Sequence, residues 1–268
     1  MTVKLIACDL DGTLVGEDLT FSPRLLRAVR CAQAMGVVVT LATGRGFASA
    51  LNFARKLGTG APLICYQGAL LRTQSGETLH QTSLSREHLP GVIAFCEQQG
   101  WELTVYSDDQ VYYTARVHDQ AYYERWFSLP AHFVDDLLAA LPGDPIKFII
   151  IADSKARGDQ LEADLRALAG GRFSVTRSHD WFVEGVALEA SKGDALARLA
   201  CRLGIDQAQV MALGDSGNDR SMVAWAGVGV AMGNALAEVK AVADVIAPPQ
   251  AEDGAAWAIE RYVLENGR

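Results

Sequence analysis

Short apolar segments alternate with amphipathic ones at both ends of the chain, and this alternation constrains the fold more than any other feature. The first third predicts strands over 4–8, 37–42 and 63–66. It predicts helices over 23–35 and 47–57, the first of them opened by Ser22-Pro23 as N-cap and first helical residue. A strand–helix–strand–helix–strand order predicts a parallel sheet with right-handed crossovers.

The last third resumes the same rhythm. Strands are expected over 210–213, 228–231 and 245–246. Helices are expected over 192–203, 218–226, 235–241 and 253–264. Two distant parts of the chain are therefore predicted to build one parallel α/β unit.

The middle of the chain has a different character. Helices are expected over 85–99, 118–127 and 157–169, and strands over 101–106, 111–114, 146–151 and 172–176. The segment 107–110, between two aromatic strands, is typical of a hairpin turn, and hairpins pair antiparallel. We therefore predict an α/β core of residues 1–84 and 187–268, with an α+β domain of residues 85–186 inserted into it.

Composition narrows the possible partners and location. The 268 residues carry 24 basic and 32 acidic side chains, a net charge of −8, which argues against nucleic acid or an anionic membrane as the main partner. No apolar run approaches the ~20 residues of a membrane span, and the first residues read directly into a strand rather than a signal peptide. Five scattered cysteines without a CxxC pair are typical of small buried residues in a reducing compartment, so we expect a cytoplasmic protein.

Two carboxylates, Asp9 and Asp11, follow the first expected strand. Loops at the carboxyl ends of parallel strands form the ligand crevice of open α/β sheets. Like charges this close repel, which favours a bound cation, and Mg²⁺ prefers oxygen ligands that include one or two carboxylates. Solvated acids in a turn are the alternative. The run Asp-Leu-Asp-Gly-Thr directly after an apolar strand favours a functional site.

Two further segments carry groups that suit an anion. Thr43-Gly44-Arg45 ends the second strand and offers a hydroxyl, a flexible backbone and a guanidinium, although alone it is more typical of an ordinary turn. Lys192 is expected in the first turn of a helix, where a cation opposes the helix dipole. That placement suggests neutralisation of a phosphate or carboxylate, although an exposed lysine is the simpler interpretation of the segment alone.

A fourth segment, Gly214 to Asp219, puts two acids four residues apart in a glycine-containing turn after a buried strand. A loop in which Asn218 caps a helix is the alternative. Its position at a strand's carboxyl end favours a metal site that includes Asp215.

These four segments, in this order, resemble the haloacid dehalogenase superfamily of phosphohydrolases. The similarity is to the Cof-type sugar-phosphatase branch, which has a Rossmann-like parallel-sheet core and a large inserted C2-type (IIB) α+β cap. It extends to residues 227–239, Ala243-Asp244 and 252–254. The insertion between Gln67 and Lys192 is about 100 residues long, which fits that cap class. Two positions depart from the branch, because Gln67 stands where asparagine is usual and Ala251 where asparagine is frequent.

The resemblance implies a Mg²⁺-dependent phosphatase. Asp9 would be the nucleophile and a metal ligand, and Asp11 the general acid and base, bound to metal through its backbone carbonyl. Asp215 would be the other carboxylate ligand, and Asp219 would complete the catalytic set with Lys192. The residues that would bind the phosphate are Leu10, Thr43, Gly44, Arg45, Lys192 and Asn218.

The substrate expected from the resemblance is a small phosphorylated metabolite, such as a sugar phosphate, and the chain would act as a monomer or homodimer. A phosphomutase similar to phosphomannomutases, or a non-catalytic phosphoacceptor or metal-binding regulator, stays open. The sequence does not fix the ester or the cap residues that select it. Candidates are Asp108, Tyr112, Arg116 and Trp181, although aromatic residues on strands are more often core.

Overall fold

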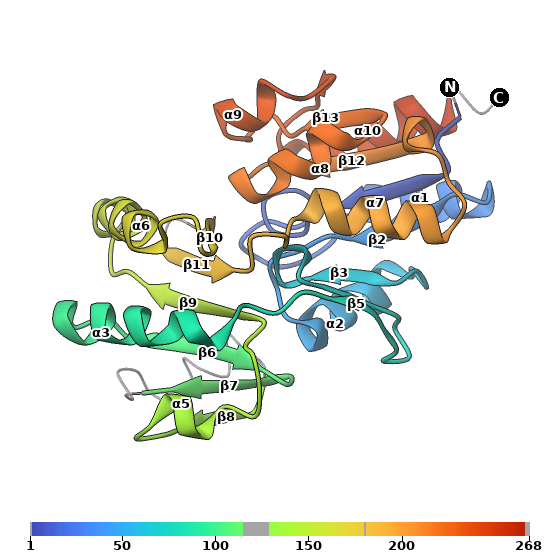
Figure 1. Ribbon diagram of the computed structural model, residues 1–268. Coiled ribbons are helices and arrows are strands. Elements are labelled where there is room, and N and C mark those ends of the chain that lie inside the picture. Colours follow the sequence, from blue (N-terminus) through green and yellow to red (C-terminus); the bar gives the residue numbers. More distant parts are fainter. Residues whose placement is uncertain (1, 115–128, 180, 266–268) are drawn as a thin grey trace.

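The computed structural model describes residues 2–114, 129–179 and 181–265, and its elements gather around two main sheets (Figure 1). The first is a parallel sheet in the order β14-β13-β12-β1-β2. Its strands are β1 (Leu5–Cys8), β2 (Val38–Leu41), β12 (Val210–Gly214), β13 (Val228–Ala231) and β14 (Val245–Ile246). The parallel α/β core predicted from the alternation is confirmed.

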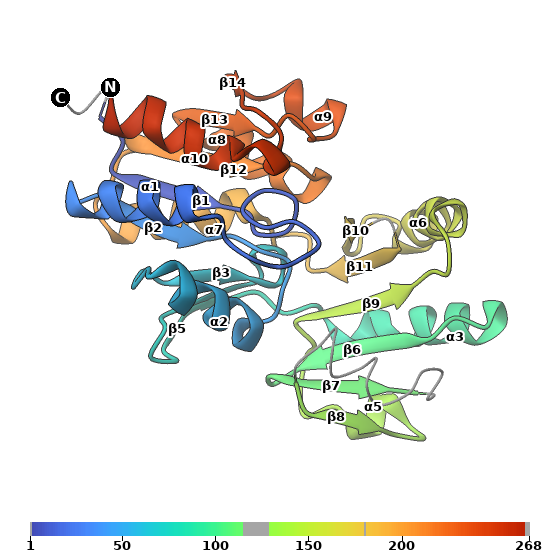
Figure 2. The ribbon, with the colours of Figure 1, turned by 180° about the vertical axis from the view of Figure 1, so that it is seen from behind.

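Helices cover both faces of this sheet, as Figures 1 and 2 show from opposite sides. One face carries α1 (Pro23–Ala34) and α10 (Gly254–Ile259), and the other carries α7 (Lys192–Arg202) and α8 (Arg220–Trp225). The four residues of β1 are fully buried, as expected for an uninterrupted apolar strand covered on both sides. The remaining helices of this part are α2 (Phe47–Leu57) and α9 (Ala237–Lys240).

A small antiparallel sheet continues the parallel one. Its strands are β3 (Leu63–Cys65), β4 (Leu70–Arg72) and β5 (Thr78–Gln81). A parallel bridge between Ala42 and Ile64 joins β3 to the end of β2. The β4–β5 hairpin has no counterpart among the predicted elements.

The second main sheet, which we call the cap sheet, has the order β10-β11-β9-β6-β7-β8. Its strands are β6 (Leu103–Ser107), β7 (Gln110–Tyr113), β8 (Ala131–Phe133), β9 (Lys147–Ile151), β10 (Ser174–His179) and β11 (Phe182–Val186). The helices among the described residues of this part are α3 (Leu89–Gln99), α5 (Leu137–Ala140) and α6 (Lys155–Ala169). The predicted hairpin is confirmed, with a two-residue turn at Asp108 and Asp109, both in the left-handed region.

The two faces of the cap sheet have different neighbours. Side chains such as Phe148 and Val183 pack with α3 and α6 in a hydrophobic cluster of their own. On the other face, Ile149 and Val186 join the cluster that fills the α/β core. The cap sheet is therefore apolar on its outer side and turns a mixed face toward the core.

Several predicted elements differ in detail from the structure. The strand expected over 172–176 is β10, shifted toward the C-terminus, and β8 and β11 were not predicted. The helix expected over 218–226 is a 3₁₀ turn, Gly217–Asp219, followed by α8, and Ser216 and Asp219 form a capping box at its start. The helix expected over 253–264 is α10 followed by a π-helical segment, Glu260–Leu264. Further 3₁₀ turns span Tyr66–Gly68, Arg86–His88, Gln207–Gln209 and Gln250–Glu252.

Three other expectations can be compared with the structure. The helix predicted over 118–127 lies outside the described residues. Cys8, Cys65 and Cys96 are buried as expected, but burial is wrong for Cys31 and Cys201, which lie on the outer sides of α1 and α7. Within residues 2–114, 129–179 and 181–265, no helix combines the length and apolarity needed to cross a bilayer.

Candidate active site

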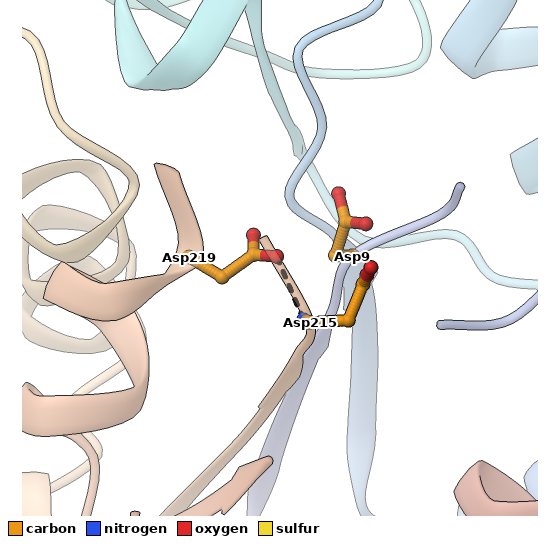
Figure 3. Close-up of side chains that lie close together, drawn as sticks. All are labelled: Asp9, Asp215 and Asp219. Atoms are coloured by element: carbon orange, nitrogen blue, oxygen red, sulfur yellow. Dashed lines mark hydrogen bonds between the residues drawn. The ribbon is translucent and has the colours of Figure 1, made fainter. Parts of the chain in front are cut away.

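The loops at the carboxyl edge of the parallel sheet bring three aspartates together. Asp9 directly follows β1, Asp215 directly follows β12, and Asp219 ends the 3₁₀ turn that comes next. One carboxylate oxygen from each residue lies within 4.8 Å of the other two. Figure 3 shows the three side chains close together at the ends of their strands. The segments predicted to converge at a sheet edge therefore do so.

Lys192 lies in the middle of this acidic group and is fully buried. Its Nζ is 2.6 Å from Asp9 Oδ1 and 2.5 Å from Asp219 Oδ1. It opens α7, whose N-cap is the side chain of Ser191. Burial alone lowers the pKa of Lys192, but the carboxylates of Asp219 and Asp9 more than offset this and raise it above its ordinary value. Lys192 is thus a permanent cation in the site, and the exposed-lysine interpretation does not apply.

Both carboxylate oxygens of Asp219 accept hydrogen bonds from the protein. Its Oδ1 accepts from Lys192, and its Oδ2 accepts the backbone N–H groups of Asp215 at 2.9 Å and Ser216 at 3.0 Å. The dashed line in Figure 3 marks the bond to Asp215. These contacts fix Lys192 and the loop after β12 in place, which leaves Asp9 and Asp215 as the carboxylates best able to take an external cation.

The electrostatics of Asp9 and Asp215 indicate an excess of negative charge. Burial, followed by the charge of Asp219, raises the pKa of Asp9 well above its ordinary value, although Lys192 opposes the shift. Burial, with the same neighbouring charge, raises the pKa of Asp215 to about 6, although a hydrogen bond from Thr13 opposes it. A bound cation would relieve this repulsion.

The groups present fit a magnesium ion. The donors are oxygens alone, the ligand type that this hard cation prefers. The Thr13 hydroxyl donates to Asp215 Oδ1 at 2.8 Å and so orients the carboxylate. Gly12 lies against the same side chain, since a Cβ there would be 2.5 Å from Asp215 Oδ2. The loop after β1 is thus shaped around Asp215, 202 residues later in the chain.

Asp11 lies outside this carboxylate group and pairs with Arg45. The guanidinium binds it in a bidentate manner, with Nε 2.7 Å from Oδ2 and Nη2 2.6 Å from Oδ1. A further bond of 3.3 Å runs from Arg45 Nη1 to Ser49 Oγ. Arg45 is therefore part of the site rather than a surface residue, and both oxygens of Asp11 are engaged.

The residues expected to hold phosphate lie near these carboxylates, and one of them, Leu10, can act only through its backbone. Thr43 is buried, and its Oγ1 accepts the N–H of Arg45 at 3.1 Å. The Leu10 side chain is fully buried in the core cluster, so only its backbone can take part. Asn218 donates to Gln67 Oε1 at 2.6 Å, while its own Oδ1 is buried without a partner in the part of the chain that the structure describes.

The crevice between the core and the cap sheet has a volume of about 130 Å³. Its lining consists of Asp9, Asp11, Gly44, Arg45, Gly46, Ser49, Tyr106, Lys147, Ile149, Phe182, Glu184, Ser216 and Asn218. Lys147 and Glu184, which sequence reasoning missed, contribute a buried ion pair to this lining. The missed signal was a single charged residue in each of two otherwise apolar segments, KFIII and FVEGV.

Three of the four cap residues named as substrate candidates lie away from this crevice. Asp108 lines a separate cavity of about 340 Å³. Tyr112 packs into the outer cluster of the cap sheet, and Trp181 is 43% exposed and does not line the crevice. Arg116 lies outside the described residues.

The carboxylates and the buried lysine lie at the carboxyl edge of the parallel sheet, beneath a second sheet, which is where enzymes with open α/β sheets bind their ligands. The sequence model of one such family, the haloacid dehalogenase-like hydrolases, matches residues 6–259. The chain belongs to this family and is an enzyme of the phosphatase type, which confirms the resemblance carried by the four segments.

Individual relatives agree with this assignment. The chain is 32% identical over 263 residues to the 5-amino-6-(5-phospho-D-ribitylamino)uracil phosphatase YcsE of Bacillus subtilis, covering 98% of this chain and 96% of that protein. It is 29% identical over 239 residues to the HMP-PP phosphatase of Serratia proteamaculans, covering 89% and 87%. A haloacid dehalogenase-like hydrolase structure from Bacteroides thetaiotaomicron superposes with a TM-score of 0.83 at 28% identity, covering 97% and 99% of the two chains.

Proposed function

We propose that this protein is a magnesium-dependent phosphatase that hydrolyses small phosphomonoesters, sugar phosphates among them, through a phosphorylated Asp9. The observation that carries the proposal is the position of Asp9 at the sheet edge, paired with Lys192 and adjacent to Asp215. Two relatives named above as phosphatases support the reaction, and the name of one specifies a phosphorylated ribityl group, which is a sugar-alcohol phosphate.

In this mechanism Asp9 is the nucleophile. Lys192 binds Oδ1, which leaves Oδ2 to attack phosphorus, so that a bond from Asp9 to phosphorus forms as the bond to the ester oxygen breaks. Water then attacks the phosphoryl group and releases inorganic phosphate and free Asp9. Lys192 stabilises the charge on the transferring group, where positioning and electrostatics dominate.

Asp11 is the proposed general acid and base. It would protonate the leaving alcohol and then take a proton from the attacking water, a role typically worth ~100- to 10,000-fold in rate. Because Arg45 binds both of its oxygens, this pair must open before Asp11 can act. Arg45 would then be released toward the phosphate, beside the Thr43 hydroxyl and the backbone of Leu10 and Gly44.

Magnesium would be held by Asp9, Asp215 and the backbone carbonyl of Asp11, and would offset negative charge on the phosphoryl oxygens. Asn218 and Asp219 orient the groups around it, Asp219 through Lys192 and the Asp215 amide. Residues 85–186 would act as a cap over the core of residues 1–84 and 187–268, excluding water from the crevice. A cytoplasmic location and a monomeric or homodimeric state stay predictions.

The test is release of inorganic phosphate from a panel of sugar phosphates, nucleotides and other small phosphomonoesters. We expect turnover with Mg²⁺, none with excess chelator, and none for Asp9→Asn, whose thermal unfolding should show an intact fold. Undiminished turnover in chelator would contradict the magnesium assignment. Steady hydrolysis by Asp9→Asn would contradict the covalent step.

A further inference from the structure

We infer that the buried Lys147–Glu184 pair of the cap sheet is a positioning element for the phosphate-binding loop, which it fixes when the cap lies on the core. The inference rests on the proposed phosphatase function. It concerns two residues of the inserted segment, which act through Gly44 and Gln67 of the core.

Burying the charges of this pair costs free energy. Lys147 opens β9 and Glu184 lies in the middle of β11, on the face turned toward the core. The two residues are 3% and 1% exposed, with 2.7 Å between Nζ and Oε2. Removing both charges from water costs enough that a buried ion pair is seldom more stabilising than an apolar pair of the same size. Stability therefore does not explain these charges in strands of Ile, Val and Phe.

Lys147 reaches the core at the phosphate-binding loop. Its Nζ donates to the backbone carbonyl of Gly44 at 3.0 Å. That carbonyl belongs to the same peptide group as the N–H of Arg45, which donates to Thr43 Oγ1. By holding one end of the peptide, Lys147 fixes the orientation of its other end, and with it the Thr43 hydroxyl.

Glu184 reaches the core through Gln67. Gln67 Nε2 donates to Glu184 Oε1 at 3.2 Å, and Gln67 Oε1 accepts from Asn218 Nδ2 at 2.6 Å. The amide of Gln67 passes directly over Gly44, where a Cβ would lie only 2.4 Å from Nε2. A chain of hydrogen bonds thus connects the cap sheet, Gln67 and the loop that carries Asn218.

These contacts favour positioning over direct recognition of a leaving group. Lys147 is held by Glu184 and Gly44, and it also lies 5.0 Å from the centre of the Tyr106 ring. Glu184 is held by Lys147 and by Gln67, so both charges are bonded to groups of the core loops before any substrate binds. The expected consequence of breaking the pair is therefore weaker binding of the phosphoryl group itself, by the same factor for every ester.

The experiment measures binding of inorganic phosphate, in the presence of Mg²⁺, by calorimetry, together with kcat/KM for two esters with different leaving groups. For Lys147→Met we expect phosphate binding about 10- to 100-fold weaker, and kcat/KM lowered by a similar factor for both esters. The matched control is Lys155→Met, which removes a lysine from an exposed pair with Asp159 on α6 and should change neither quantity. Lys147→Arg, which can still donate to both partners, should restore part of the loss.

Three results would overturn the inference. One is unchanged phosphate binding with a loss of kcat/KM that differs between the two esters, since this would assign the pair to the leaving group. Another is a Lys147→Met variant that binds phosphate as the wild-type protein does and differs from it only by a lower unfolding temperature. If Lys147→Met does not fold, the double variant Lys147→Met, Glu184→Gln, which contains no unpaired buried charge, takes its place. Failure of that variant to fold would assign the pair to stability.

Failure of the proposed function would look different. A wild-type protein that binds phosphate yet releases none from any ester would contradict phosphatase activity. The calorimetric comparison of the variants would still decide whether the pair positions the loop.

Discussion

Removal of the Lys192 charge is the perturbation whose consequences follow most directly from the structure. The side chain is fully buried and neutralises Asp9 and Asp219 at 2.6 and 2.5 Å. Lys192→Met keeps most of the apolar stem and removes the ammonium group. Three carboxylates, each with an oxygen within 4.8 Å of the other two, then lose the lysine that pairs with two of them.

The magnitude can be worked from these contacts. Breaking a buried ion pair by removing one partner costs about 3 to 5 kcal/mol of unfolding free energy. For a chain of this size we expect a fall in Tm of about 5 to 9 °C. Lys155→Met is the control, since its exposed pair with Asp159 is worth at most about 1 kcal/mol.

Thermal unfolding without divalent cation, at pH 7.5 and at pH 4.5, is the assay. The loss should be smaller at pH 4.5, because the pKa of Asp9 is already raised by burial and by Asp219, and a protonated Asp9 needs no cation. Magnesium at pH 7.5 should recover part of the loss. An unchanged Tm for Lys192→Met, or a loss equal at both pH values, would refute this electrostatic account.

Three further predictions concern the same edge of the sheet. Because the pKa of Asp215 is raised to about 6 in the folded protein, its contribution to stability is complete below about pH 4 and is lost as the pH rises through 6. Without cation the unfolding free energy should therefore fall by about 2 to 3 kcal/mol over that window. Added Mg²⁺ should raise Tm more at pH 7.5 than at pH 4.5, and equal shifts in Tm would contradict the assignment. Gly12→Ala should weaken Mg²⁺ binding measured by calorimetry, because a Cβ would lie 2.5 Å from Asp215 Oδ2 and Gly12 has a φ of +82°; wild-type affinity would show that the loop tolerates the change. Asp11→Asn should lower kcat by about 100-fold or more while phosphate still binds, and unchanged turnover would exclude Asp11 as the acid and base.

The strands and helices of the core are predicted well, because each is marked by the pattern of its own neighbouring residues. Continuous apolar runs such as β1 and β12 are typical of strands covered on both faces, and they are separated by amphipathic helices. Chemistry-bearing residues placed directly after such strands must meet at one edge. Asp9 and Asp215, 206 residues apart by their numbers, can therefore be placed at one edge from the strand pattern, and the resemblance to the family implies that they share one site.

The parts that were missed depend on contacts between distant segments. Glu184 and Gly185 interrupt the apolar pattern of β11, so the strand and its ion pair with Lys147 were not predicted. The pair is buried only because the cap sheet turns this face toward the core, which no local pattern reveals. The bidentate contact of Arg45 with Asp11 and the role of Gln67 as a bridge likewise arise from packing.

The covalent role of Asp9 is tested most directly by rapid acid quench of the enzyme during turnover, followed by mass spectrometry of the peptide that contains this residue. We predict a population of that peptide heavier by one phosphoryl group, formed only while substrate and Mg²⁺ are present and absent from Asp9→Asn. Rapid turnover with no such peptide at any quench time, or with the added mass on another residue, would contradict the account.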